Sequence, residues 1–65
     1  MNWDQIEGKW KEMTGAAQKR WGKLTDNDLQ EVKGSRRELA GKVQSAYGVT
    51  KEEAEKQVDD WAKMN

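Results

Sequence analysis

Residues 8–22, GKWKEMTGAAQKRWG, and residues 34–48, GSRRELAGKVQSAYG, decide the fold, because they are two copies of one pattern. All 6 glycines of the 65-residue chain lie in these stretches, and in each stretch they recur every seventh residue. A Thr-x-x-acid sequence follows each copy, from Thr25 and from Thr50. Such a sequence is typical of the first turn of a helix. The pattern therefore predicts a doubled unit of helix, stop and helix.

The composition limits what such a chain can be. At 65 residues we expect a single domain over residues 1–65, and a chain of this size buries only about 60% of its unfolded surface. Cysteine and histidine are absent, which removes disulfides, thiolate metal sites and the commonest general base. The charged fraction of 37% favours disorder, but 4 tryptophans carry large apolar surfaces and favour a folded chain.

The first segment carries the apolar stripe of a long amphipathic helix. Asn2 or Asp4 can cap its start, with Gln5 or Glu7 as the reciprocal partner, and Gly22 is placed to end it in the left-handed conformation. The stripe residues follow a 3-4-3-4-4 spacing and fall within about 80° of a helical wheel. They are Trp3, Ile6, Trp10, Met13, Ala17 and Trp21. We predict one helix over about residues 3–21, with its tryptophans in the core.

Capping sequences predict where three shorter helices begin. Thr25 with Asp28 and Ser35 with Glu38 each form a capping box, and Thr50 begins the last helix. The expected helices are about 26–33, 36–47 and 51–63. Turns of two to four residues make sequential helices neighbours. The predicted fold class is therefore all-α, a small four-helix bundle of two crossed helical hairpins.

Two glycines lie in predicted helix interiors, where each costs about 1 kcal/mol relative to alanine. Gly15 and Gly41 lie about 160° from the centres of their own apolar stripes, so they do not serve to close the core. Three interpretations remain: close contact with a neighbouring helix, tuned instability of the fold, or a docking groove with Gly8, Lys11 and Lys19 along one strip. The candidate interaction surface of the third interpretation comprises Gly8, Lys11, Gly15, Lys19, Arg37 and Gly41.

The basic side chains suggest one alternative function. Lys19-Arg20, Lys23 and Arg36-Arg37 are the only basic clusters. The two repeats are each mildly basic and the two helices that follow them are mildly acidic, so internal charge complementarity explains this distribution more simply than nucleic-acid binding. The 12 basic and 12 acidic side chains of the whole chain also cancel, which disfavours nucleic acid and anionic lipid as partners.

Catalysis finds no support in the sequence. The paired acids at 52–53 and 59–60 are adjacent, so on a helix they diverge by about 100° and form no two-carboxylate site. The hydroxyl groups have no histidine to activate them. We therefore predict no enzyme, no cofactor, no metal and no small-molecule substrate. The sequence has no apolar run of about 20 residues and no signal-peptide pattern, so we expect a cytoplasmic protein. We also expect a monomer, and the sequence does not exclude a macromolecular partner.

Together with the two glycine repeats, GKLTDNDL at residues 22–29, Leu39-Ala40-Gly41-Lys42-Val43-Gln44, Tyr47-Gly48 and Asp60-Trp61 make the chain resemble the CsbD-like family. The resemblance covers essentially the full length and is closest to the tryptophan-containing subgroup from Gram-negative bacteria. It implies a small hydrophilic protein of the bacterial general stress response, with two crossed hairpins similar to SAM-like domains. It implies no catalytic or ligand-binding residue.

Two hypotheses for function follow. The first is a non-enzymatic stress-response protein that acts as a protective or interaction module. The protective role is inferred from the hydrophilic composition, the helix-interior glycines and the cancelled charge. The alternative is a weak nucleic-acid- or membrane-surface-associated regulator that uses Lys19, Arg20, Lys23, Arg36 and Arg37.

Overall fold

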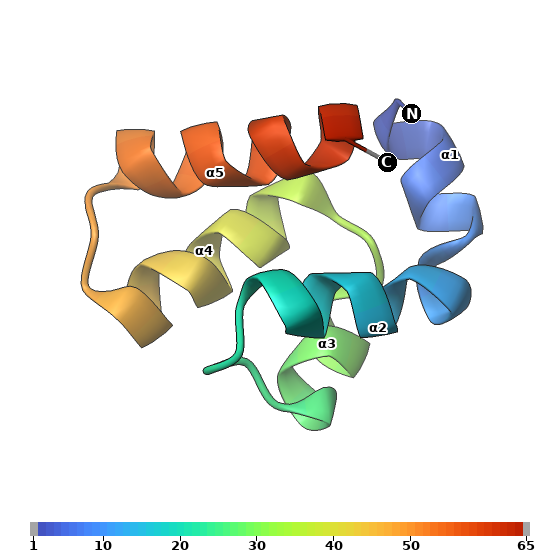
Figure 1. The fold of residues 1–65 in the computed structure, drawn as a ribbon, viewed down its shortest axis with the longest axis horizontal. Coiled ribbons are helices and arrows are strands. Elements are labelled where there is room, and N and C mark those ends of the chain that lie inside the picture. The colour runs from blue at the N-terminus through green and yellow to red at the C-terminus, as the bar shows by residue number, and fades with distance from the viewer. Residues whose placement is uncertain (1, 65) are drawn as a thin grey trace.

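The structure is a computed structural model that describes residues 2–64. Every regular element in this range is an α-helix, which confirms the all-α class. Figure 1 shows α4 and α5 side by side, with α2 and α3 on the other side of α4 and the N-terminal end of α1 beside the C-terminal end of α5. The helices are α1 (Trp3–Gly8), α2 (Trp10–Arg20), α3 (Asp26–Val32), α4 (Arg36–Tyr47) and α5 (Lys51–Met64).

The prediction of one helix over residues 3–21, and with it the count of four helices, is wrong. The chain bends at Lys9, which has φ −113° and ψ 18°, and α1 turns away from the axis of α2 (Figure 1). The bend lets Trp3 reach α5, where its ring centroid lies 6.2 Å from that of Trp61. A straight helix would keep the stripe on one face but would carry Trp3 away from this contact.

A contact from a distant part of the chain holds the bend. Gly34, in the turn between α3 and α4, packs directly on α1 with φ +82°, and a Cβ at this position would lie only 2.7 Å from the Cα of Glu7. The close approach requires glycine. Lys33 also has positive φ, at 54°, so α3 ends at Val32, two residues before Gly34.

The predicted caps are largely present. Asn2 and Gln5 form a capping box at α1, and Thr25 with Asp28 forms another at α3. The hydroxyl of Thr50 accepts a hydrogen bond of 3.1 Å from the Glu53 N–H. These side chains satisfy N–H groups that the first turn of a helix leaves without partners.

Only half of the capping box predicted at Ser35 is present. The Ser35 hydroxyl accepts a hydrogen bond from the Glu38 N–H at 3.3 Å. The N–H of Ser35, however, donates to the carbonyl of Val32 at 3.0 Å. The tight turn between α3 and α4 therefore takes the donor that the glutamate side chain was expected to bind.

The last glycines of the two repeats behave differently. Gly48 ends α4 in the left-handed conformation, with φ 66°. The prediction that Gly22 ends the first helix in the left-handed conformation is wrong, because α2 ends at Arg20 and its C-cap is Trp21, which has φ −125° and ψ 82°. The ring of Trp21 is fully buried, and the N–H of Leu24 donates to the Trp21 carbonyl at 3.0 Å. A buried aromatic ring followed by this turn replaces the left-handed glycine.

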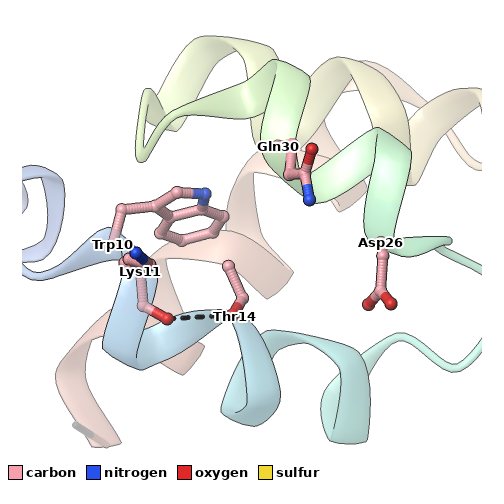
Figure 2. A pocket seen from close by; sticks show the side chains of 5 residues that line it. All are labelled: Trp10, Lys11, Thr14, Asp26 and Gln30. Carbon is pink, nitrogen blue, oxygen red and sulfur yellow. Dashed lines mark hydrogen bonds between the residues drawn. The ribbon is translucent and has the colours of Figure 1, made fainter.

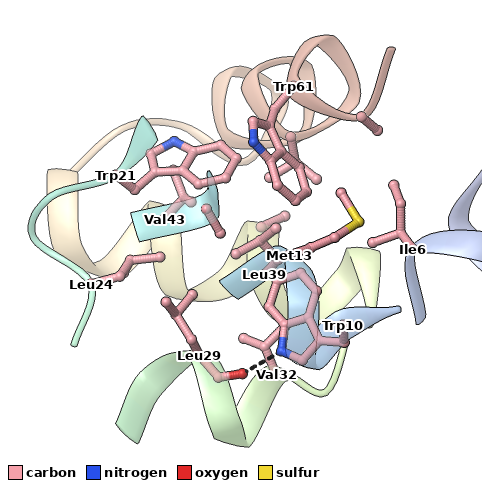
Figure 3. Close-up of a cluster of buried hydrophobic side chains, with 14 of the residues drawn as sticks. Ile6, Trp10, Met13, Trp21, Leu24, Leu29, Val32, Leu39, Val43 and Trp61 are labelled. Carbon is pink, nitrogen blue, oxygen red and sulfur yellow. Dashed lines mark hydrogen bonds between the residues drawn. The ribbon is translucent and has the colours of Figure 1, made fainter. Parts of the chain in front are cut away.

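The tryptophans form the centre of the core, as predicted (Figure 3). Trp10, Trp21 and Trp61 are 7%, 0% and 3% exposed, and Trp3 packs against them half-buried. The Trp61 centroid lies 5.4 Å from that of Trp21 and 6.2 Å from that of Trp10. The Trp10 indole N–H donates to the Leu29 carbonyl at 2.7 Å, so this buried donor has a partner. The other large, fully buried side chains are Ile6, Leu24, Leu29, Leu39, Val32, Val43 and Val58.

Candidate functional site

Two groups of ion pairs join the second repeat to the acidic helices on either side of it in sequence, α3 and α5. Arg36 binds Asp59 through two hydrogen bonds of 2.6 and 2.9 Å, with Glu55 at 3.8 Å. Lys42 lies 2.7 Å from Glu31 and also approaches α3 at its first turn. Both cations come from the second repeat, so the pairs show charge complementarity between that repeat and the acidic helices α3 and α5. The individual partners were not predicted, because they depend on how the hairpins pack.

These contacts shift the pKa values of their members. The hydrogen bonds from Arg36 lower the pKa of Asp59, with a smaller contribution from the Trp3 indole, and raise the pKa of Arg36 itself. The pKa of Asp28 is lowered chiefly by the backbone N–H of Thr25, which its carboxylate accepts in the capping box. Each shift favours the charged form of the group.

The predicted basic clusters do not form one surface. Arg36 is engaged with Asp59 at the start of α4, whereas Lys19, Arg20 and Lys23 lie at the end of α2 or in the turn that follows it. The Arg20 guanidinium lies 5.3 Å from the centroid of its neighbouring indole, and the Lys23 ammonium lies 5.1 Å from the centroid of the Tyr47 ring. Two of the five cations are thus placed over aromatic rings. Lys19 and Arg37 are exposed, on different helices.

A groove between α2 and α3 lies beside the core tryptophan Trp10 (Figure 2). It has a volume of about 550 Å³, and the indole of Trp10 forms one wall. The Thr14 hydroxyl donates to the Lys11 carbonyl at 3.1 Å. The rest of the lining comes from two helices and consists of ordinary polar residues, of which Thr14 is half-buried and the others are exposed, so no signal in the sequence could have identified the groove. The lining residues are Trp10, Lys11, Thr14, Asp26 and Gln30.

The six residues of the predicted interaction surface do not meet at one place. Lys11 lines the groove between α2 and α3, while Arg37 and Gly41 line a separate, shallow hollow along α4. Gly15 and Lys19 follow Lys11 on the exposed side of α2, and Gly8 lies beyond the bend, on α1. All six are exposed. The six residues of the predicted interaction surface are therefore divided between at least two faces of the molecule.

The helix-interior glycines have no packing role. A Cβ added at Gly15 or Gly41 would meet nothing within 4 Å, and the same holds for Gly8. The interpretation that a neighbouring helix approaches these glycines closely is therefore wrong. Tuned instability and docking remain as explanations, because both leave the glycine surface open.

Neither a metal site nor a membrane span emerges from the described part of the chain. Among residues 2–64, no cluster of three or more Asp, Glu, His or Cys side chains is arranged to hold a metal ion. No helix within the same residues is both long enough and apolar enough to cross a bilayer. What the fold and these surfaces define is a small all-helical protein with an aromatic core and a highly charged exterior.

Comparison with known proteins gives the family. Residues 4–56 match the family model described as CsbD-like. The chain is 56% identical over 61 residues to UPF0337 protein pc0632 of Protochlamydia amoebophila, covering 94% of this chain and 92% of that protein. It is 46% identical over 65 residues to UPF0337 protein YjbJ of Escherichia coli K12, covering 100% of this chain and 94% of the relative. The chain therefore belongs to the CsbD-like family, as the sequence motifs predicted.

Proposed function

We propose that this protein is a non-enzymatic, cytoplasmic stress-response module that protects other macromolecules through a fold of deliberately low stability. The observation that carries the proposal is the open surface at Gly15 and Gly41, two helix-interior glycines that contact no neighbour. Each lowers helix stability by about 1 kcal/mol relative to alanine, while a domain of this size has only a few kcal/mol in total. No packing or backbone requirement offsets this loss at either position.

The physical consequence is a helical chain that loosens readily. Loosening would release a hydrophilic chain with 37% charged residues and a net charge of +0, which stays soluble in the open state and can cover the surfaces of other proteins. Indole rings from the core would supply apolar contact area at the same time. Low stability and protection are thus linked in one mechanism.

The double variant Gly15→Ala/Gly41→Ala tests this link. We expect it to unfold at a higher denaturant concentration than the wild type and to protect a heat-labile enzyme from aggregation less well. Gly22→Ala is the matched control, since Gly22 is also open but lies outside the helices. A double variant that is more stable and equally protective would exclude tuned instability and leave docking as the interpretation.

The arrangement within the bundle is part of the proposal. We propose that α2–α3 and α4–α5 are the two hairpins and that they cross as in SAM-like domains. A solution structure with interproton contacts between α2 and both members of the second hairpin would support this arrangement.

The alternative hypothesis is a nucleic-acid- or membrane-surface-associated regulator that uses five cations. One of them, Arg36, is bound to Asp59. Binding to DNA, RNA or anionic vesicles that weakens steeply with salt would support the regulator hypothesis.

A further inference from the structure

The first apolar stripe is continuous in sequence, but the helix that carries it is interrupted at a single residue. The Lys9 N–H still donates to the Gln5 and Ile6 carbonyls at 3.0 and 3.2 Å, and its carbonyl accepts from the Glu12 and Met13 N–H groups at 2.9 and 3.1 Å. Among residues 2–64, no backbone hydrogen bond runs from Trp10 back to α1. A change of the Lys9 dihedral angles toward helical values would restore a regular ladder.

Gly8 makes this position a hinge. It is the last residue of α1, it has open space around a would-be Cβ, and glycine is a poor helix former. No side-chain cap closes the start of α2 at Lys9. The junction therefore has few interactions that favour the bent form over the straight one.

The bent form is instead held by what α1 covers. Ile6 is 0% exposed, Trp3 packs on Trp61, and the backbone of Glu7 lies against Gly34. We call the surface that receives α1, made by Trp61 and the turn at Gly34, the α1 seat. A six-residue helix has little stability in isolation, so α1 is ordered by its seat. If α1 leaves the seat, the seat exposes apolar surface, and this favours binding of another segment of the same shape.

We propose that straightening at Gly8–Lys9 joins α1 and α2 into one helix, and that α1 then occupies the α1 seat of a second copy of this chain. The product is a domain-swapped dimer in which two chains exchange residues 3–8. A continuous helix over residues 3–20 would be about 27 Å long, enough to carry α1 beyond its own bundle. The occupant must be α1 of another copy, because the seat fits Trp3 and Ile6. Each contact that α1 makes with its seat in the monomer recurs between chains in the dimer, so the protein concentration sets the balance between the two.

Replacing the hinge glycine tests the proposal. In the bent form Gly8 is the last residue of α1, whereas in the straight helix it would be interior, where the preference for alanine over glycine is largest. We therefore expect the dimerisation constant of Gly8→Ala to exceed that of the wild type by up to about five-fold for each exchanged chain. Size-exclusion chromatography with light scattering, after refolding at high protein concentration, measures the dimer fraction. Gly15→Ala and Gly41→Ala are matched controls, because both are open helical glycines outside the hinge. A Gly8→Ala dimer fraction no larger than in these controls would overturn the proposal.

Two further measurements separate exchange from simple association. Insertion of two glycines between Gly8 and Lys9 lengthens the hinge without touching the seat, and we expect it to abolish the dimer. In a Gly8→Ala dimer made from isotope-labelled and unlabelled chains, filtered NMR spectra are expected to show contacts between Trp3 of one chain and Trp61 of the other. A dimer in which these contacts are only intramolecular would disprove the exchange. These readouts do not depend on any protective activity.

Discussion

The two copies of the glycine pattern are alike in sequence but differ in structure. Gly8 and Gly34 occupy the same position in the pattern, yet Gly8 is helical with open space around it, while Gly34 has φ +82° and lies against the backbone of Glu7. Gly22 and Gly48 are also equivalent, but only Gly48 is left-handed. The first copy contains a bend, whereas the second forms one uninterrupted helix.

This difference teaches that a repeated residue need not repeat its role. The conformation of each glycine follows from what lies next to it in space, and the two copies meet different neighbours. Only Gly15 and Gly41, the central pair, have similar surroundings, because both face solvent. Substitutions at equivalent positions of the two copies should therefore have unequal effects.

The largest difference in lost stability is expected between the aromatic residues that precede the last glycine of each copy. Trp21 is fully buried, whereas Tyr47 is half-buried and accepts a hydrogen bond from the Lys23 N–H at 3.2 Å. Trp21→Ala should lower the free energy of unfolding by about 3–5 kcal/mol, enough to unfold most of the chain. Tyr47→Ala should cost clearly less. Urea denaturation followed by far-ultraviolet circular dichroism measures both, and equal losses would contradict the structural difference.

The next contrast concerns the glycines that begin the copies. Gly34→Ala should cost about 2–4 kcal/mol, because alanine disfavours positive φ and its Cβ would press on the Glu7 backbone. Gly8→Ala meets no atom and should leave stability unchanged or raise it by up to about 1 kcal/mol. Thermal unfolding of the two variants in parallel provides the measurement. A tolerated Gly34→Ala would show that the turn does not press on α1.

Local sequence was sufficient to predict the helical segments and the core, because apolar spacing and capping sequences act within one turn of a helix. It was insufficient for the bend at Lys9, which depends on the contact between Gly34 and Glu7 and so on residues far apart in the chain. The candidate site could not be predicted for the same reason. The partners of Arg36 and the lining of the groove at Trp10 come from separate helices, and only their packing brings them together.

A smaller contrast is expected at the glycines that end the copies. Gly48→Ala forces alanine into the left-handed region, φ 66°, and should cost about 1–2 kcal/mol. Gly22→Ala should be close to neutral, because Gly22 has neither positive φ nor a close neighbour. Chemical denaturation resolves a difference of this size. Equal costs would indicate that Gly22 also adopts the left-handed conformation in solution.

The smallest contrast concerns two acids at non-equivalent positions in the helices that follow the copies, Asp28 in α3 and Asp59 in α5. Asp28 is held within its own capping box, while Asp59 is held by Arg36 from the second copy. Both carboxyl groups have a folded-state pKa below the ordinary 3.8. Each therefore binds a proton less readily when folded, so its contribution to stability is present above pH 3.8 and is lost as the pH falls through the folded pKa.

Asp59→Asn should remove the part of this acid sensitivity that comes from the ion pair between α4 and α5. The side chains of Arg36 and Asp59 are 38% and 42% exposed, so solvent screens the pair and the loss at neutral pH should be only about 0.2–1 kcal/mol. Stability of the variant should then fall less steeply than that of the wild type below pH 3.8. Asp60→Asn, at the exposed neighbouring position, is the control, because it removes a carboxylate and leaves the Arg36–Asp59 pair in place. Parallel acid slopes for Asp59→Asn and the wild type would show that the Arg36 pair contributes nothing to folding in solution.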